Sequence, residues 1–287
     1  MGYLNLWGSC FHCSKKLLLL IPISKAYHGM PFTIPMMNTK FYVFSSPTAV
    51  ATVFGNSREY LFPPVVASMM ENGVDLPVPD RKFFNIPLSD KKRSEQATEA
   101  EHDFVKQNHT VYLKYLTSKR LDDIMAVYID NFYSELDKAL GVDILGYEWT
   151  EIQLHECMRR IIFETSTTTF FGNRIRSYWG KNMWQDFRTW NDATYIGVRA
   201  NFAYYFQPSA YFARRRMLQA FDKWVDCEIE EWSEEAPLWN EKWGCRMNWE
   251  REKLARHFGF THRGRACSQA SFLFVQVSMC CYLMVGD

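Results

Sequence analysis

Near the start of the chain, apolar and polar residues alternate along two short runs separated by Asn38-Thr39. The first run carries apolar residues at every second position, namely Phe32, Ile34 and Met36, and the second, from Lys40 to Phe44, is rich in aromatic and β-branched residues. Alternation with a period of two residues is typical of strands that bury one face. The pattern therefore predicts a β-hairpin.

A short helix and a long loop are predicted to follow this hairpin. Ser46-Pro47 matches an N-cap residue followed by proline in the first helical position, and Gly55-Asn56 provides a stop signal. From Leu61 to Ser94 the chain holds five of its eleven prolines, so we expect an extended irregular segment there. Loops of this length are commonly functional or mobile.

Beyond the loop, apolar residues recur at steps of three and four, the period of an amphipathic helix. One such stripe runs from Leu121 to Leu140, and Gly141 follows it. A second runs from Leu154 to Phe171, and we expect Gly172 to be the left-handed residue after its end.

Two further helices are predicted in the second half of the chain. Pro208 opens one that continues to Trp232 and leaves the basic cluster Arg214 to Arg216 mostly to solvent. The last helix, from Ala266 to Met284, is apolar on all sides, which is typical of a helix in the interior of a protein.

Taken together, these elements predict a mainly α protein with a small β-hairpin near its start. We find no internal repeat and no composition break that marks a linker. The predicted organisation is an irregular segment over residues 1–24 and a single domain over residues 25–287.

Charge and cysteine content narrow the function classes. The net charge is +1, from 33 basic and 32 acidic residues, so we expect no nucleic-acid partner. Eight cysteines lack the regular spacing of a disulfide framework, which favours a reducing compartment. The apolar run Leu17 to Ile21 stops at Pro22, far short of the ~20 residues that cross a bilayer. We therefore predict no membrane anchor within these residues.

Short catalytic motifs are scarce. Cys10-Phe-His-Cys13 has the spacing of half a zinc site, but the second ligand pair is missing, so we interpret it as part of an irregular segment. The chain contains no H-E-x-x-H, P-loop, G-x-G-x-x-G or G-x-S-x-G motif. Metalloprotease, nucleotide-hydrolysing, nicotinamide-dependent and acyl-transfer chemistry therefore have no local signature.

Three segments, in this order, resemble the cytochrome P450 family. Pro31 to Pro47 is similar to the first hairpin of the family and the short helix after it, and Thr150 to Gly172 is similar to a central helix that ends in an aromatic-glycine pair. His257 to Phe274 resembles the approach to the long helix that crosses over the haem, especially in fungal enzymes. The resemblance covers roughly residues 25 to 275.

This resemblance implies a haem-thiolate monooxygenase that uses dioxygen to oxidise lipophilic small molecules, such as sterols or fungal secondary metabolites. A reductase would be the redox partner, and the family lies on the cytoplasmic side of the endoplasmic reticulum membrane. The resemblance also implies that Leu61 to Asp80 and Trp184 to Tyr211 line or gate the substrate pocket. No individual residue receives a catalytic or cofactor-binding role.

One departure from the family bears directly on function. Members hold haem iron through a thiolate in the pattern F-x-x-G-x-x-x-C-x-G, because an anionic sulfur favours O–O cleavage. Neither Cys245 nor the adjacent pair Cys280 and Cys281 lies in that pattern. We therefore expect a truncated, catalytically inactive chain that binds no haem stably. The alternative is a non-catalytic helical module that binds a ligand or a protein.

Glu156-Cys-Met-Arg159 spells the E-x-x-R motif that the family uses as a structural ion pair. It lies upstream of the predicted long helix, whereas the family's pair lies downstream. We therefore interpret Glu156 and Arg159 as an ordinary i,i+3 surface pair, which contributes a few tenths of a kcal/mol.

Overall fold

The computed structural model describes residues 30–36, 39–44, 46–56, 69–84, 99–117, 119–140, 152–197, 204, 207–226 and 236–283. Its first elements confirm the predicted hairpin, in which strand β1 (Phe32–Met36) pairs antiparallel with β2 (Thr39–Val43) and Phe32 lies opposite Val43. Helix α2 (Pro47–Gly55) follows, and the Ser46 side chain accepts a hydrogen bond from the Ala49 N–H at 3.2 Å. The predicted cap therefore forms, because a serine oxygen satisfies a free N–H of the first turn.

The long segment after α2 is more ordered than its prolines indicate. Within the described part lie a π-helical turn η2 (Met69–Gly73) and a 3₁₀ helix η3 (Val78–Phe83). The expectation of a wholly irregular loop is thus wrong over these residues. Pro77 and Pro79 lie at the start of η3, where their fixed φ angles suit the first helical positions.

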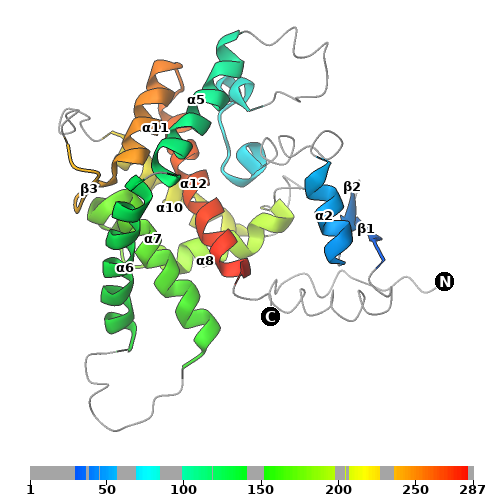
Figure 1. Ribbon diagram of the computed structural model, residues 1–287, viewed down its shortest axis with the longest axis horizontal. Coiled ribbons are helices and arrows are strands. Elements are labelled where there is room, and N and C mark those ends of the chain that lie inside the picture. Colours follow the sequence, from blue (N-terminus) through cyan, green and yellow to red (C-terminus); the bar gives the residue numbers. More distant parts are fainter. Residues whose placement is uncertain are drawn as a thin grey trace.

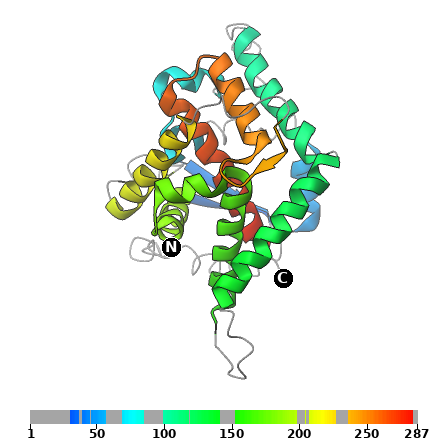
Figure 2. The ribbon, with the colours of Figure 1, turned by 90° about the vertical axis from the view of Figure 1, so that its left-hand side faces the viewer.

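Most of the structure is a helical body (Figures 1 and 2). Helices α5 and α6 contact each other, α7 packs on α6, α10 and α12, and α8 packs on α10. In both views α12 runs through the middle of the body. The mainly helical fold class is confirmed. The helices are α5 (Glu99–Leu116), α6 (Lys119–Leu140), α7 (Leu154–Trp179), α8 (Met183–Gly197), α10 (Pro208–Val225), α11 (Arg246–His257) and α12 (His262–Leu283).

Helix α7 departs from helical geometry at Gly172, where φ is +71° and ψ is −175°, and then continues to Trp179. The predicted positive φ is therefore present, but the helix bends there and does not end. A break of this kind frees backbone groups that need new hydrogen-bond partners. Around Gly172 these partners come from other elements of the fold.

Four backbone groups at the bend have hydrogen-bond partners outside α7. The carbonyl of Phe170 accepts from the Asn248 side chain at 2.8 Å, and the carbonyl of Phe171 accepts from the Trp224 indole at 2.9 Å. On the other side, the N–H groups of Asn173 and Arg174 donate to two carbonyls of the segment between strands β3 (Trp239–Asn240) and β4 (Gly244–Cys245). The bend thus ties α7 to α10, α11 and this small hairpin.

The approach of the hairpin to α7 requires glycine on both sides. A Cβ on Gly172 would lie 2.5 Å from the Gly244 nitrogen, and a Cβ on Gly244 would lie 2.4 Å from the Phe170 carbonyl carbon. Gly244 also has a positive φ, of 80°. Both positions therefore need glycine for backbone conformation and for space.

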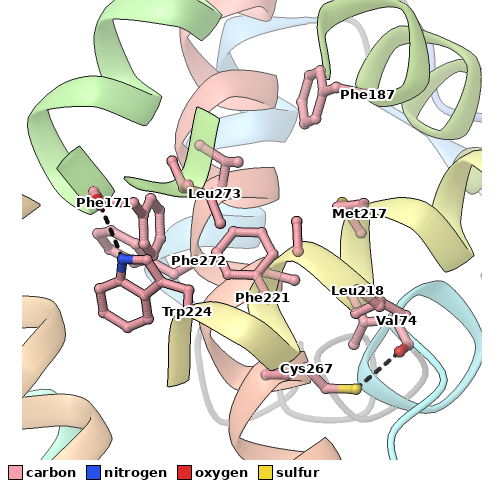
Figure 3. Close-up of a cluster of buried hydrophobic side chains, with 14 of the residues drawn as sticks. Val74, Phe171, Phe187, Met217, Leu218, Phe221, Trp224, Cys267, Phe272 and Leu273 are labelled. Atoms are coloured by element: carbon pink, nitrogen blue, oxygen red, sulfur yellow. Dashed lines mark hydrogen bonds between the residues drawn. The ribbon is translucent and has the colours of Figure 1, made fainter. Parts of the chain in front are cut away.

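The main hydrophobic core lies where α7, α10 and α12 meet. Phe171 packs edge-on against Phe221 and Trp224 of α10, with ring centroids 5.0 and 5.4 Å apart, and against Phe272 of α12. Figure 3 shows these rings together, with the Trp224 indole aimed at the Phe171 carbonyl. Leu273 of α12 is fully buried. The prediction that α12 lies in the interior is confirmed for its described side chains.

Helix α10 is described from Pro208 to Val225, and the Asp226 N–H donates to the Asp222 carbonyl. The Val225 carbonyl accepts from the Arg256 guanidinium of α11 at 2.6 Å. The predicted continuation to Trp232 falls on residues outside the described part of the chain.

Replacing Gly172 with alanine tests the bend. We expect Gly172→Ala to lower the free energy of unfolding by roughly 2 to 5 kcal/mol, because it adds backbone strain and a clash with the hairpin. Gly180→Ala is the matched control: its φ of 88° is also positive, but its new Cβ has nothing within 4 Å. The control should lose only about 1 to 2 kcal/mol in urea unfolding. Equal losses would show that the close approach contributes nothing.

One arginine joins the two long helices α6 and α7. The Arg176 guanidinium donates to Glu164 at 2.7 Å and to Glu135 of α6 at 2.8 Å. Burial raises the pKa of the Glu164 carboxyl, although the Arg176 charge opposes this shift. The folded protein therefore holds the Glu164 proton at pH values where the unfolded chain has already lost it.

This shift has a defined effect on stability. From about pH 4.5, the ordinary pKa of the glutamate, upward to its raised value in the fold, the folded state binds more protons than the unfolded state. The free energy of unfolding therefore falls as pH rises through that window. We expect the unfolding free energy of wild type, measured relative to Glu164→Gln, to decrease from pH 4.5 upward in urea titrations. A difference that is constant with pH would contradict this prediction.

Candidate functional site

The described part of the chain contains one turn that is held by side chains of α8, α10 and α12 and by Tyr204. The turn covers residues 72–76, which include the last two residues of η2 and lead toward η3. Three successive carbonyls of this turn accept hydrogen bonds from distant side chains. Asn72 accepts from Arg214 at 3.0 Å, Gly73 from Trp190 at 3.1 Å and from Tyr204 at 3.5 Å, and Val74 from Cys267 at 3.1 Å. We call this arrangement the clasped turn.

The clasped turn covers part of the hydrophobic core. Met70, Val74 and Leu76 are buried and belong to the same apolar cluster as Cys267. Between them, Asp75 has a φ of +59°, which makes it the one residue other than glycine with a positive φ in the described structure. A backbone in this region is strained for most side chains and persists when its surroundings hold it.

Arg214 provides the one positive charge among the four donors. Its guanidinium lies 4.1 Å from the centroid of the Tyr204 ring and is 6% exposed as a residue. The prediction that Arg214 faces solvent is therefore wrong. Its neighbours behave differently, since Arg215 is exposed and Arg216 pairs with buried Asp186 at 2.5 Å. A run of three arginines gave no indication of which one points inward.

Burial also acts on the tyrosine below this guanidinium. It raises the pKa of the Tyr204 hydroxyl, whereas the Arg214 charge acts in the opposite direction. Tyr204 therefore remains a neutral donor toward the Gly73 carbonyl at physiological pH. No pattern in the sequence singled out Tyr204.

A second contact fixes η3 to the start of α12. The buried Asp80 carboxylate accepts from the Thr261 N–H at 2.9 Å and from the Thr261 hydroxyl at 2.5 Å. The Thr261 oxygen in turn accepts from the Gly264 N–H at 3.0 Å, as a helix cap does. The absence of a side chain at Gly264 leaves room for the carboxylate, because a Cβ there would lie 2.1 Å from it. A negative charge at this helix end is favourable.

The two segments expected to line a pocket contact each other at this site. Within Leu61 to Asp80, the described residues 69–80 form η2, the clasped turn and the start of η3. Within Trp184 to Tyr211, Trp190 of α8 and Tyr204 donate to the turn, whereas Arg214 of α10 lies three residues beyond this segment. Residues 61–68, 198–203 and 205–206 lie outside the described part.

The E-x-x-R pair does not behave as a surface pair. Arg159 is 8% exposed and lies 4.0 Å from Glu156 but 3.2 Å from Asp192 of α8. Glu156 pairs instead with Arg188 of α8 at 2.6 Å. The predicted i,i+3 contact is present at 4.0 Å, but the interpretation as an ordinary surface pair is wrong, because Arg159 is buried and α8 packs against this face of α7 and supplies nearer partners.

A third buried arginine, Arg251, was not identified from the sequence at all. Arg251 of α11 is 3% exposed and donates only to uncharged acceptors. Burial lowers the pKa of its guanidinium. Its acceptors are Asn248 at 3.1 Å, Gln269 at 3.0 Å, the Ser268 carbonyl at 3.0 Å and Asn108 at 3.3 Å. With its partners supplied by α5, α11 and α12, Arg251 is a structural crosslink.

The described cysteines do not fit the role of a haem ligand. Cys245 and Cys267 are 1% and 0% exposed, so neither sulfur is open to a porphyrin in this fold, and burial raises the pKa of both thiols to about 12. The Cys267 thiol also donates to Val74, and both residues lie inside the main apolar cluster. Cys157 is half-buried near the start of α7. The side chains of Cys280 and Cys281 and the whole of Cys10 and Cys13 lie outside the described residues.

Two further kinds of site, metal centres and membrane spans, can be assessed among the described residues. Nowhere among them do three or more histidine, cysteine, aspartate or glutamate side chains gather as metal ligands. Within the same residues, no helix combines the length and the apolar character that a membrane span needs.

Comparison of the chain with protein-family models, with curated proteins and with solved structures gave no match.

Replacing the Asp80 carboxylate tests the contact between η3 and α12. We expect Asp80→Asn to lower the free energy of unfolding by roughly 1 to 3 kcal/mol, because one acceptor oxygen and the charge at the helix end are lost. Asp122→Asn is the control, since Asp122 is an exposed carboxylate in the first turn of α6. The control should change stability by less than about 0.5 kcal/mol in the same urea titration. A wild-type value for Asp80→Asn would exclude an energetic role for this contact.

Proposed function

We propose that this chain is a cytochrome P450-like helical unit that does not catalyse oxidation by itself. In full-length relatives, such a unit forms one wall of a pocket for a lipophilic substrate, and haem with dioxygen performs the oxidation. The residues assigned to the pocket wall are those of the clasped turn and of the elements around it, α8 and the start of α10.

One observation carries the proposal: the place of α12 in the order and packing of the elements. The chain passes from a hairpin and a short helix through the clasped turn and six helices to a buried helix in the middle of the body (Figure 1). This is the order of the segments that resemble the P450 family, whose long helix crosses over the haem. Contacts of α12 with α7, α10, α11 and η2 support the same assignment.

We propose a lack of catalysis because haem-thiolate chemistry needs a cysteine ligand to the iron. The 287 residues contain no F-x-x-G-x-x-x-C-x-G pattern, and Cys245 and Cys267 are buried in the apolar core. An axial ligand must supply an anionic sulfur to the iron. No reaction step is therefore assigned to this chain.

A second candidate is a non-catalytic module that binds another protein through α6. Met125, Ile129 and Tyr133 lie four residues apart on one face of this helix and are 42%, 47% and 60% exposed. An amphipathic helix with an exposed apolar stripe is a common element of protein recognition. This candidate places the function on a surface away from the clasped turn.

The lack of a haem ligand is tested by spectroscopy of the purified chain. After incubation with haemin, reduction and addition of carbon monoxide, we expect no Soret band of the thiolate type, because Cys245 and Cys267 are buried in the apolar core, out of reach of a porphyrin. Cys245→Ser and Cys267→Ser should give the same spectrum as the wild type. A thiolate-type band that disappears in one of these variants would overturn the proposal of a non-catalytic unit.

The family assignment needs a test with a positive outcome. A fusion of this chain to the cysteine-bearing segment of a fungal haem-thiolate monooxygenase should bind haem and give the thiolate-type band, whereas the same fusion with that cysteine changed to serine should not. A soluble fusion that melts cooperatively but takes up no haem would count against a P450-like unit and in favour of the binding module.

A further inference from the structure

The clasped turn depends on one buried cation. The Arg214 guanidinium donates to the Asn72 carbonyl at 3.0 Å and stacks on the Tyr204 ring, with Tyr211 a further 5.7 Å contact. Asp75 is the carboxylate that pairs with it, at 4.0 Å, and the Asp75 side chain is 62% exposed. Arg214 therefore reaches from α10 to the turn mainly through a charge-assisted hydrogen bond and a cation–π contact.

The other contacts to the turn are weaker by their chemistry. Trp190 donates a neutral hydrogen bond at 3.1 Å, Tyr204 donates one at the long distance of 3.5 Å, and Cys267 donates through a thiol, which is a weak donor. Hydrogen bonds from a charged donor are roughly twice as strong as neutral ones. The positive φ of Asp75 adds backbone strain that these contacts must hold.

Beneath the turn lie packed apolar side chains that are closed to solvent. Figure 3 shows Val74 above Cys267, with Leu218 beside them and Met217 of the same helix nearby. All four side chains are less than 2% exposed. If the turn lifts, the first surface to reach solvent is therefore apolar, together with the Cys267 thiol.

We propose that Arg214 is a latch. By this we mean a positioning residue that holds the clasped turn (residues 72–76) against α10 and α12. Release of the latch opens a local route from solvent to the apolar core between the turn, α10 and α12, and that route would admit an apolar small molecule. This inference goes beyond the proposed function and does not depend on it, since neither haem nor the family assignment enters the argument.

Two buried cysteines make the latch measurable in the full-length chain. Cys267 lies under the turn, whereas Cys245 lies at the bend of α7; both are 1% exposed or less, and burial raises the pKa of both to about 12. Alkylation of each thiol by iodoacetamide at pH 8, followed by mass spectrometry of its peptide, reports how often each site opens. Global unfolding exposes both thiols, but lifting the turn exposes Cys267 alone.

We expect Arg214→Ala to raise the ratio of the Cys267 rate to the Cys245 rate at least about tenfold over wild type, because the charged hydrogen bond and the ring contact are both lost. Arg214→Met should give the same rise, since methionine keeps apolar bulk on Tyr204 but has no donor. Arg215→Ala is the matched control, because Arg215 is the exposed neighbour on the same helix. Its ratio should equal that of wild type.

Two results would overturn the latch. If both thiols react faster by the same factor in the Arg214 variants, Arg214 contributes to general stability and not to the turn. If the ratio stays at the wild-type value in both Arg214 variants, the turn is held by its other contacts. The ratio remains informative for a destabilised variant, because Cys245 reports global unfolding in the same sample.

Discussion

The bend at Gly172 is the constraint on which the rest of the helical body depends. A helix that breaks in a protein interior must find new partners for its freed carbonyl and N–H groups, since each unpaired buried group costs about 1 to 3 kcal/mol. Here the partners come from α10, α11 and the β3–β4 hairpin. Satisfying one bend thus sets the positions of three other elements. The aromatic rings of Phe170 and Phe171, on the residues just before the bend, then orient α10 and α12 around α7.

The clasped turn is a second buried segment whose backbone groups need hydrogen-bond partners from other elements. Its carbonyls point inward and accept from side chains of α8, α10 and α12, so the turn can be buried without being part of a sheet or a long helix. Asp80 adds a fixed point where η3 meets the first turn of α12. The turn is held by side-chain donors, one of them charged, and by backbone bonds from the N–H groups of Val74 and Leu76. The bend at Gly172 combines two neutral side-chain donors with two backbone bonds to the hairpin.

Several buried polar groups in the described core have partners within the protein. Arg251 is surrounded by neutral acceptors, and Asp186 is paired with Arg216 and with the Trp179 indole. Cys267 donates a hydrogen bond to Val74, and both Cys245 and Cys267 pack inside the main apolar cluster. The hydroxyls of Thr165 and Thr168, in contrast, are buried without a hydrogen-bond partner among the described residues.

Local sequence patterns were sufficient to predict those helices and strands whose start, stop and periodicity are set by residues close together in the chain. The alternation around Phe32 and the Ser46-Pro47 cap predicted the hairpin and α2, and the stripes predicted α6, α7, α10 and α12, because strand and helix periods depend on neighbours along the chain. The sequence also contained Gly172 as a site of positive φ. It did not show that α7 continues beyond it, since continuation depends on acceptors in a hairpin almost 70 residues away.

Tertiary structure alone decided which charged residues lie inside. Arg214, Arg215 and Arg216 are equivalent by composition, yet one is buried, one is exposed and one is paired with a buried aspartate. The same holds for Arg159, which contacts α8 more closely than its neighbour in the chain. Burial of a charge is stable only where distant groups provide partners for it. Those partners meet only when the chain has folded. Hydrophobic patterns therefore indicated α6, α7, α10 and α12 but not α5, α8 or α11, and packing determined the site.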